Sequence, residues 1–370
     1  MQPSSLQLPR LKRDQLLTLL LMVAFVPGSS SCGIERRAGV GYESLRPVST
    51  VVIVTFDGVR PEEIFAIAGP GLESEALLRS EVAMPFFLDE LGPSGVFLGH
   101  PETGEPMTVA NPLAVSLPGY QSMFSGRPTL CFSNECGRPM GETLFDRVHE
   151  AFELPKESIS VFASWKGLCA GLGLDNRFDA HCGADAIQAS WRSQIGGTPR
   201  EGKEELPLAV DEAAFDLALQ RLREPLPTLL YLALDATDAT GHANDYAGHL
   251  SALAQYDEWL RALDQRLRQL EAKGHRSALL VTTDHGRGSG EGWSQHRWNV
   301  SESERVWLFA RGPGIAATGP VGTSEKTTLT SVRPTVEEWL ALEPVRGPLF
   351  GPPLTEILGQ LRLRSESFSD

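Results

Sequence analysis

Acidic and histidine residues follow three short apolar runs of this sequence, and one further histidine lies downstream. The residues, in chain order, are Asp57, Asp238, His242, Asp284, His285 and His296. The apolar runs that precede them span residues 51–56, 229–234 and 278–282. Carboxylate oxygens and imidazole nitrogens are the protein ligands that zinc and similar divalent cations bind. The pattern therefore predicts a divalent metal site wherever the fold brings these residues together.

Each piece of this pattern also has a purely structural explanation. Asp57 before Gly58 is compatible with a turn that closes a strand, and the segment 238–242 with a helix cap followed by a glycine turn. His296 taken alone is compatible with a structural histidine. The adjacent Asp284 and His285 are harder to explain this way, because two ionisable groups at a buried strand end must be paired or bind a metal.

Ser116 is the candidate nucleophile. It opens the segment Ser-Leu-Pro-Gly-Tyr at residues 116–120, and Pro118 suits the first turn of a helix. A hydroxyl at that place lies beside free backbone N–H groups at the positive end of the helix, which favours a bound phosphate group. The alternative is an ordinary serine cap with no chemistry.

The candidate residues need elements that carry them to one place. Apolar, β-branched runs predict strands at 51–56, 158–163, 229–234, 278–282 and 306–310. Helical spacing of apolar residues predicts helices at 142–152, 212–223, 249–273 and 332–342. This alternation predicts an α/β fold with a mostly parallel central sheet and helices on both faces. Side chains that follow parallel strands gather at the carboxyl edge of such a sheet, so the candidate residues are expected to meet there.

The predicted organisation is one large domain with short terminal extensions. We expect an export signal at 1–31, a linker at 32–48, the α/β domain at 49–362 and a loose tail at 363–370. Residues 186–207, rich in glycine, serine and charge, are expected to form a surface excursion. The formal net charge of −14 disfavours nucleic-acid binding as a main role, because nucleic-acid binders present a basic face.

The N-terminus resembles an export signal, with a basic start, an apolar run at 16–26 and small residues before Cys32. The run is shorter than the roughly 20 apolar residues of a membrane-spanning helix. Serines directly before Cys32 resemble a lipoprotein cleavage site, but Ser29 stands where such sites usually carry an aliphatic residue. Lipid attachment at Cys32 and ordinary cleavage nearby both stay open. Either outcome predicts a periplasmic or cell-surface protein.

Four further cysteines, Cys131, Cys136, Cys169 and Cys182, form an even set in a chain with an export signal. Disulfides are therefore expected. Pairing of neighbours, 131 with 136 and 169 with 182, is the simplest arrangement, although four cysteines allow three pairings. A zinc cluster is the alternative explanation, but the spacings of five and thirteen lack the C-x-x-C pairs of structural zinc sites.

Taken together, these motifs are similar in order and context to those of the alkaline phosphatase superfamily. The resemblance runs from about residue 51 to 342 and rests on the Asp57-Gly58 strand end, the Ser116 segment, Asp238 with His242, Asp284 with His285, and the single His296. It is strongest with the exported phosphodiesterase-like and phosphatase-like branch.

The resemblance implies an enzyme with two divalent metal ions, zinc by expectation. Asp238, His242 and His296 would hold one ion, and Asp57, Asp284, His285 and the Ser116 oxygen the other. Ser116 would attack the phosphorus of a small-molecule phosphate ester and form a phosphoserine intermediate, which a metal-activated water then hydrolyses. Lys166 is the candidate for binding the non-bridging oxygens, with a solvated surface lysine as the alternative.

Several relatives within the resemblance remain as alternatives. Sulfatases carry an arginine where this chain has Tyr120, which disfavours a sulfatase. Many nucleotide phosphodiesterases carry an asparagine where this chain has Gly119, so monoester and diester substrates both stay open. A related phosphoglycerate mutase is cytosolic and ranks lower. A non-catalytic metal-binding protein of the same fold is the competing class, and the sequence indicates neither the natural substrate nor the oligomeric state.

Overall fold

An eight-stranded sheet forms the centre of the computed structural model, which describes residues 48–65, 83–196, 206–223, 225–297, 299–323 and 325–358. The expected export signal at 1–31, the candidate lipidation residue Cys32, the linker up to residue 47 and the tail at 363–370 lie outside the described residues.

The sheet is mostly parallel, as the sequence predicts. Its strands follow the order β4-β3-β5-β1-β6-β7-β2-β8, and β7 runs antiparallel to both of its neighbours. The strands are β1 Thr50–Phe56, β2 Val96–Leu98, β3 Ile159–Ala163, β4 Asp179–Cys182, β5 Leu229–Leu234, β6 Ser277–Thr282, β7 Leu308–Arg311 and β8 Gly319–Pro320. Every residue of β1, β5 and β6 is buried, which explains why these strands read as continuous apolar runs.

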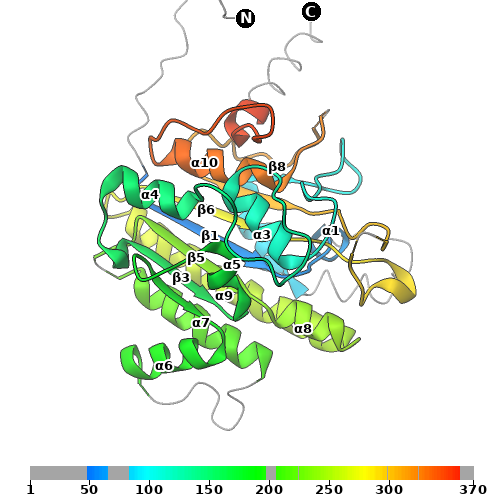
Figure 1. The fold of residues 1–370 in the computed structure, drawn as a ribbon, viewed down its shortest axis with the longest axis horizontal. Coiled ribbons are helices and arrows are strands. Elements are labelled where there is room, and N and C mark those ends of the chain that lie inside the picture. Colours follow the sequence, from blue (N-terminus) through cyan, green and yellow to red (C-terminus); the bar gives the residue numbers. More distant parts are fainter. Residues whose placement is uncertain are drawn as a thin grey trace, which may run out of the picture. The chain divides into compact units, whose positions relative to one another are not determined.

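Helices cover both faces of the sheet (Figure 1). They are α1 Pro61–Phe65, α3 Ser116–Ser125, α4 Leu144–Phe152, α5 Gly167–Leu172, α6 Ala184–Gln194, α7 Pro207–Arg221, α8 Ala236–His242, α9 Tyr246–Glu271 and α10 Val332–Trp339. Val52 and Val54 of β1 share one hydrophobic cluster with residues of α7 and α9. Val51 and Ile53 share the other with residues of α3, α4 and α10. Successive strand side chains point to opposite faces, so a fully apolar strand needs helices on both.

The helices begin and end close to the predicted positions, with one correction. Residues 184–194, which the composition places in a surface excursion from 186 onward, form helix α6. Ile187 of α6 is fully buried in the cluster that α7 and α9 form. A single buried apolar side chain among polar residues gives little periodic signal, so packing against α7 decides this helix.

The longest helix is α9, with 26 residues, and Asp245 caps its start by accepting a hydrogen bond from the backbone of Gly248. Its charged residues alternate with the apolar residues that face the sheet. None of the helices in the described ranges is both long enough and apolar enough to cross a membrane.

Two disulfides join neighbouring cysteines, which confirms the local pairing. Cys131 and Cys136 close a short loop after α3, with their Cα atoms 5.7 Å apart. Cys169 of α5 is bonded to Cys182 at the end of β4, with a Cα separation of 5.9 Å. The second bond ties α5 to a strand at the sheet edge.

We expect the Cys169–Cys182 disulfide to contribute about 3 kcal/mol to the free energy of unfolding, because it closes the longer of the two loops. The double variant Cys169→Ser/Cys182→Ser should show this loss in chemical denaturation. The matched variant Cys131→Ser/Cys136→Ser should lose less, about 2 kcal/mol, because five residues separate that pair. Free thiols at these four positions in the unreduced protein would contradict the pairing.

Candidate metal centre and nucleophile

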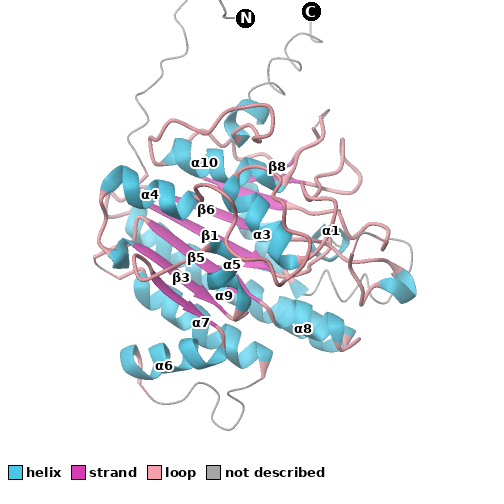
Figure 2. Ribbon diagram, in the orientation of Figure 1, coloured by secondary structure: helices cyan, strands magenta, loops and turns pink. Residues whose placement is uncertain are grey.

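The carboxyl edge of the sheet gathers the predicted ligands. Asp57 follows β1, the pair Asp284 and His285 follows β6, and β5 leads into α8. Asp238 and His242 lie one turn apart on α8. Figure 2 shows the loops that follow the central strands on the side where α8 lies. This edge collects the ends of three buried strands that are remote in the sequence, so their polar side chains meet in one place.

The structure brings six predicted ligands into two groups. Within each group the candidate ligand atoms lie within 4.8 Å of one another. One group is Asp238, His242 and His296, and the other is Asp57, Asp284 and His285. This division is the one that the resemblance implies.

The second group holds buried carboxylate oxygens that lack hydrogen-bond partners among the described residues. These atoms are Asp57 Oδ1 and Asp284 Oδ2. They lie 3.5 Å and 3.6 Å from Nε2 of His285. Buried polar atoms are normally hydrogen-bonded, so two unpaired carboxylate oxygens facing one imidazole nitrogen fit a bound cation.

The hydrogen bonds of the two buried histidines leave Nε2 available as a ligand. His285 Nδ1 lies 2.8 Å from the carbonyl oxygen of Gly286, and His296 Nδ1 lies 2.8 Å from that of Ala114. A carbonyl oxygen only accepts, so each Nδ1 donates and each Nε2 carries a lone pair. Such a backbone contact is how metal-binding histidines are commonly oriented.

The first group is partly open to solvent. His242 Nε2 lies 3.2 Å from Asp238 Oδ2 and 3.0 Å from His296 Nε2. The His242 side chain is 47% exposed, whereas that of His296 is 5% exposed. Asp235, which the pattern does not single out as a ligand, lies at the start of α8 and forms a third cluster with Asp57 and Asp238. Asp57 and Asp238 thus connect the two groups.

Burial and neighbouring charges shift the pKa values of the acidic and histidine residues in this cluster. Burial, followed by the charge of Asp284, raises the pKa of Asp57. Burial, followed by the charge of Asp238, raises the pKa of Asp284 to about 7. Burial also lowers the pKa of His285 to about 4 and that of His296 to about 3. Neutral imidazoles beside buried, mutually repelling carboxylates are the ligands that a divalent cation binds. The residues therefore fit such an ion.

Ser116 lies at the edge of this cluster. It is the first residue of α3, and its hydroxyl Oγ is 3.3 Å from His285 Nε2. The hydroxyl donates to that nitrogen, because Nε2 of His285 carries no proton in this tautomer. The structure therefore places the predicted nucleophile, the helix start and the second ligand group together.

Known structures share this arrangement of elements. The sequence matches no protein-family model and no curated protein sequence. Among solved structures, a 2-O GAG sulfatase has a TM-score of 0.59 at 14% identity, covering 84% of this chain and 74% of that one. The phosphonate monoester hydrolase of Silicibacter pomeroyi has the same TM-score and identity, with coverages of 84% and 77%. The alkaline phosphatase PafA has a TM-score of 0.56 at 11% identity, with coverages of 85% and 99%.

The chain has the alkaline phosphatase fold. This confirms the resemblance at the level of the fold, because all three structures share it. Identities below 25% show the fold alone, so the roles of individual residues rest on the geometry of this chain.

Arg287 is a central residue of the site that the motif pattern missed. Its side chain is fully buried, and it donates to Gly58 O at 3.0 Å, to Ser294 O at 2.9 Å and to a carboxylate oxygen of Asp238. Burial alone would raise the pKa of Asp238, but the hydrogen bond of His242 and the charge of Arg287 bring the net pKa down. The signal available in the sequence is an arginine two residues after His285, at the end of a buried strand.

Two glycines of the motifs allow close approaches within the alkaline phosphatase fold. A Cβ at Gly241 would lie 2.3 Å from the Arg287 guanidinium carbon. A Cβ at Gly119 would lie 2.3 Å from the carbonyl oxygen of Asp284. The second contact leaves no room for a side chain at position 119, because α3 passes too close to Asp284.

Tyr120 supports the ligand Asp57 from the other side. Its hydroxyl donates to Asp57 Oδ2 at 2.9 Å, and the tyrosine is buried. This bond occupies one carboxylate oxygen and leaves Oδ1 facing His285. Tyr120 therefore orients a predicted metal ligand.

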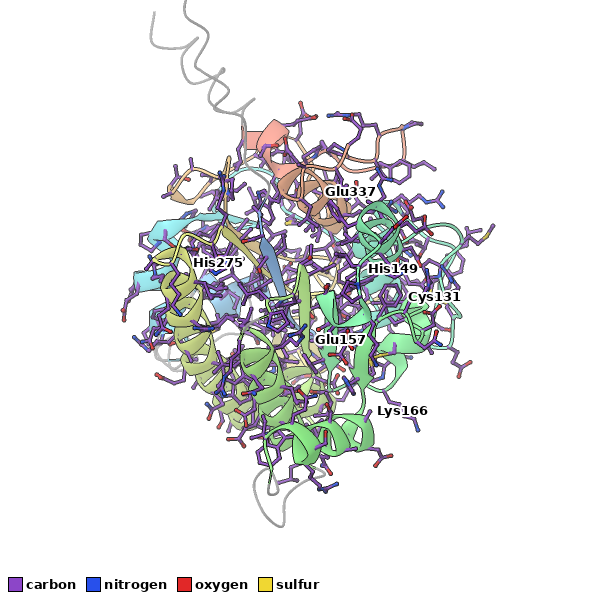
Figure 3. All side chains as sticks on the ribbon, turned by 90° about the vertical axis from the view of Figure 1, so that its left-hand side faces the viewer. Cys131, His149, Glu157, Lys166, His275 and Glu337 are labelled. Atoms are coloured by element: carbon purple, nitrogen blue, oxygen red, sulfur yellow. A yellow bond between two sulfur atoms is a disulfide. The ribbon has the colours of Figure 1, made fainter. Side chains whose placement is uncertain are left out.

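Lys166 follows β3 at the start of α5, and its side chain is exposed (Figure 3). Among the described residues, no hydrogen bond or ion pair joins Lys166 to Ser116 or to the carboxylates. Its role in binding non-bridging oxygens stays a prediction.

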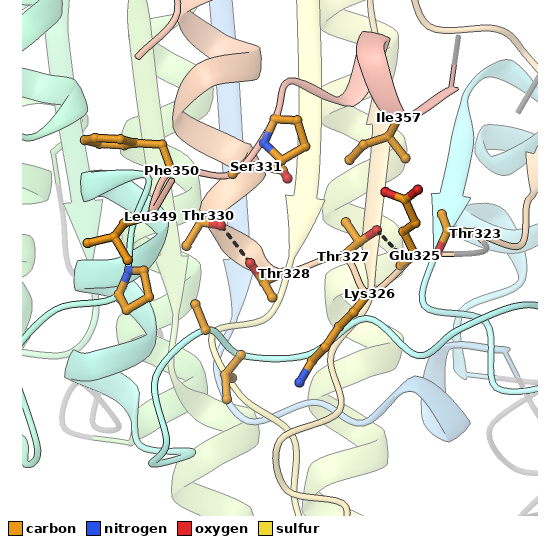
Figure 4. A pocket seen from close by; sticks show the side chains of 15 residues that line it. Thr323, Glu325, Lys326, Thr327, Thr328, Thr330, Ser331, Leu349, Phe350 and Ile357 are labelled. Atoms are coloured by element: carbon orange, nitrogen blue, oxygen red, sulfur yellow. Dashed lines mark hydrogen bonds between the residues drawn. The ribbon is translucent and has the colours of Figure 1, made fainter. Parts of the chain in front are cut away.

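A cavity of about 370 Å³ lies apart from the ligand groups, near α10 (Figure 4). One wall carries hydroxyl groups, among them Thr328 and Thr330, whose side-chain oxygens are 2.7 Å apart. Leu349, Phe350 and Ile357 form an apolar part of the lining. No predicted site residue lines this cavity. The candidate site is therefore identified from the buried carboxylate oxygens without hydrogen-bond partners and not from a cavity.

We expect Gly241→Ala to weaken zinc binding at the group that contains Asp238 about 10- to 100-fold, because the added Cβ displaces Arg287 and loosens Asp238. Zinc titration of the chelator-stripped protein by calorimetry measures this effect. The control is Gly292→Ala, since a Cβ at Gly292 meets nothing within 4 Å. Unchanged zinc affinity in Gly241→Ala would rule out this support role of Arg287.

Proposed function

We propose that this protein is a metal-dependent hydrolase of phosphate esters that uses Ser116 as its nucleophile. The observation that carries the proposal is the 3.3 Å contact between Ser116 Oγ and His285 Nε2, beside two buried carboxylate oxygens without partners. A structural serine cap would not explain why the imidazole nitrogen that its hydroxyl contacts also faces two unpaired carboxylate oxygens.

Each ligand group has three protein donors, as a catalytic metal site requires. Asp238, His242 and His296 would hold one cation, and Asp57, Asp284 and His285 the other. Two zinc ions are the proposed cofactors. Bound divalent cations supply charge stabilisation for the attacking and leaving oxygens of a phosphoryl transfer.

Ser116 is positioned for attack by the start of α3. Pro118 occupies the first turn of the helix. Backbone N–H groups in this turn have no partner within the helix, so proline costs no helical hydrogen bond there. The positive end of the helix favours an anionic phosphoryl group on the Ser116 oxygen. These features support a phosphoserine intermediate on this residue, with Tyr120 and Arg287 holding the acidic ligands in place.

Sulfate ester hydrolysis is the alternative function, because a 2-O GAG sulfatase shares the fold. Tyr120 argues against it. The sulfatase motif has an arginine at this position, and here a tyrosine is bonded to Asp57. A metal-binding protein without catalysis is the second alternative, and turnover decides between them.

Export is also proposed, to the periplasm or the cell surface. Two disulfides in the described domain are typical of proteins outside the reducing cytoplasm. Mass spectrometry of the mature N-terminus from the native host decides between lipid attachment at Cys32 and ordinary cleavage nearby, because a lipidated Cys32 would be the first residue. A retained residue upstream of Cys32 would exclude lipidation and leave ordinary cleavage.

We expect the zinc-loaded protein to hydrolyse p-nitrophenyl phosphate or its bis-ester. Ser116→Ala should lower kcat by about 10³-fold or more, because it removes the nucleophile. The matched control is Ser125→Ala, the same substitution at the other end of α3, which should keep wild-type rates.

The same panel includes p-nitrophenyl sulfate. Turnover of the sulfate ester alone would favour the sulfatase alternative. Zinc binding without turnover of any ester would favour a non-catalytic protein. Phosphate ester hydrolysis that survives Ser116→Ala would point to another nucleophile.

A further inference from the structure

A second cavity, of about 520 Å³, is lined by residues next to the candidate site. Its lining includes Ala114 and Arg297, and we name it the Arg297 cavity. Arg297 directly follows the predicted ligand His296, and the carbonyl oxygen of Ala114 lies 2.8 Å from His296 Nδ1. Ala114 is two residues before Ser116, so their Cα atoms are at most about 7 Å apart. The Arg297 cavity therefore lies beside the proposed nucleophile.

Two cationic side chains line the Arg297 cavity. Arg297 and Lys326 are both exposed, and neither side chain forms an ion pair or a hydrogen bond among the described residues. Lys326 also lines the cavity near α10, and Figure 4 shows its side chain directed away from Glu325 and Thr327. The chain has 47 acidic residues against 33 lysines and arginines, so acidic partners are in excess. These two basic side chains are nevertheless available for a ligand.

A buried hydroxyl group belongs to the same lining. Thr108 is 5% exposed, and its Oγ1 has no hydrogen-bond partner among the described residues. Backbone hydrogen bonds fix this segment, because Thr108 N donates to Thr327 O at 3.0 Å and Val109 N donates to Glu304 O at 2.9 Å. Buried hydroxyl groups are normally hydrogen-bonded, so this one fits a cavity that takes a polar ligand.

One acidic side chain faces the two cations. Glu304 is exposed, lines the Arg297 cavity and forms no ion pair with Arg297 or Lys326. The other lining residues are uncharged, so two positive charges and one negative charge leave a net charge of 2 − 1 = +1. A volume of about 520 Å³ lies within the range of small-molecule sites. The size and the charge of the cavity both suit a small anionic group.

We propose that the Arg297 cavity binds an anionic group on the alcohol part of the substrate, through Arg297 and Lys326. The substrate class is then a phosphate ester whose alcohol carries a carboxylate or a second phosphate. This inference rests on the proposed function and deepens it, because it describes the leaving group. Guanidinium and ammonium groups form charge-assisted hydrogen bonds with both kinds of anion. Ordinary solvated side chains are the alternative explanation.

Three phosphate esters of equal chain length test the assignment. They are propyl phosphate, phosphooxypropanoate, whose chain ends in a carboxylate, and propanediol bisphosphate, whose chain ends in a second phosphate. Release of inorganic phosphate by the zinc-loaded protein gives kcat/KM for each ester, halved for the bisphosphate because it has two equivalent ester groups. We expect the better anionic ester to exceed propyl phosphate about tenfold, since each exposed cation contributes a few-fold. The larger anionic value distinguishes the carboxylate from the phosphate.

Three variants test the origin of this preference. Arg297→Gln/Lys326→Gln should bring the ratio of anionic to neutral ester close to one, because it removes both cations. The ratio is the readout, since Arg297 neighbours His296 and its substitution changes the rate for every ester alike. Glu304→Gln should raise the ratio about two- to threefold, because it removes the opposing carboxylate. Lys273→Gln is the control, since this exposed lysine does not line the cavity, and should keep the wild-type ratio.

The ratios also give the results that would overturn the inference. A wild-type ratio near one, or a ratio that Arg297→Gln/Lys326→Gln leaves unchanged, would reduce both cations to solvated side chains. An equal fall in Lys273→Gln would attribute the preference to the overall charge of the protein. In each case, hydrolysis of propyl phosphate that Ser116→Ala abolishes leaves the proposed function standing. If the wild-type protein turns over none of the three esters, the proposed function and this inference both fail.

Discussion

Mutual repulsion among buried carboxylates is the constraint on which this site depends. Asp57, Asp238 and Asp284 lie at one sheet edge with little or no exposure to water. Isolated buried charges cost several kcal/mol each, so the cluster requires compensation. Arg287 compensates Asp238, and Tyr120 binds one oxygen of Asp57. The oxygens of Asp57 and Asp284 that remain unpaired face His285, and this group of buried carboxylates is the physical basis for proposing bound cations.

Close backbone approaches keep the cluster in place. Helix α3 passes the end of β6 at Gly119, and α8 passes Arg287 at Gly241, each too tightly for a Cβ atom. A side chain at either glycine would therefore displace a neighbouring acidic ligand, although the ligand residue itself is not substituted. The positions of the two ligand groups therefore depend on how the helices pack on the strand ends, and the motif glycines are as much a part of the site as the acidic residues.

The fold alone does not select a reaction, since a sulfatase, a phosphonate monoester hydrolase and an alkaline phosphatase share it. The distinguishing features are local. Tyr120 donates to Asp57, Gly119 excludes a side chain, and the Ser116 hydroxyl contacts His285. We therefore expect the side chains around Ser116, and not the fold, to determine which ester this protein hydrolyses.

The sequence by itself determined the central strands and the position of Asp57 and Asp284 after them, because these depend on short-range patterns of burial. It predicted disulfides but left three pairings open, and the tertiary structure decided the local pairing. Tertiary structure alone decided the antiparallel direction of β7, the short strands β2, β4 and β8, and helix α6, because each is stabilised by pairing with distant segments. It also decided the partners of Arg287 and Tyr120. Their hydrogen bonds join residues far apart in the chain, and local sequence periodicity does not indicate which segments the sheet brings together.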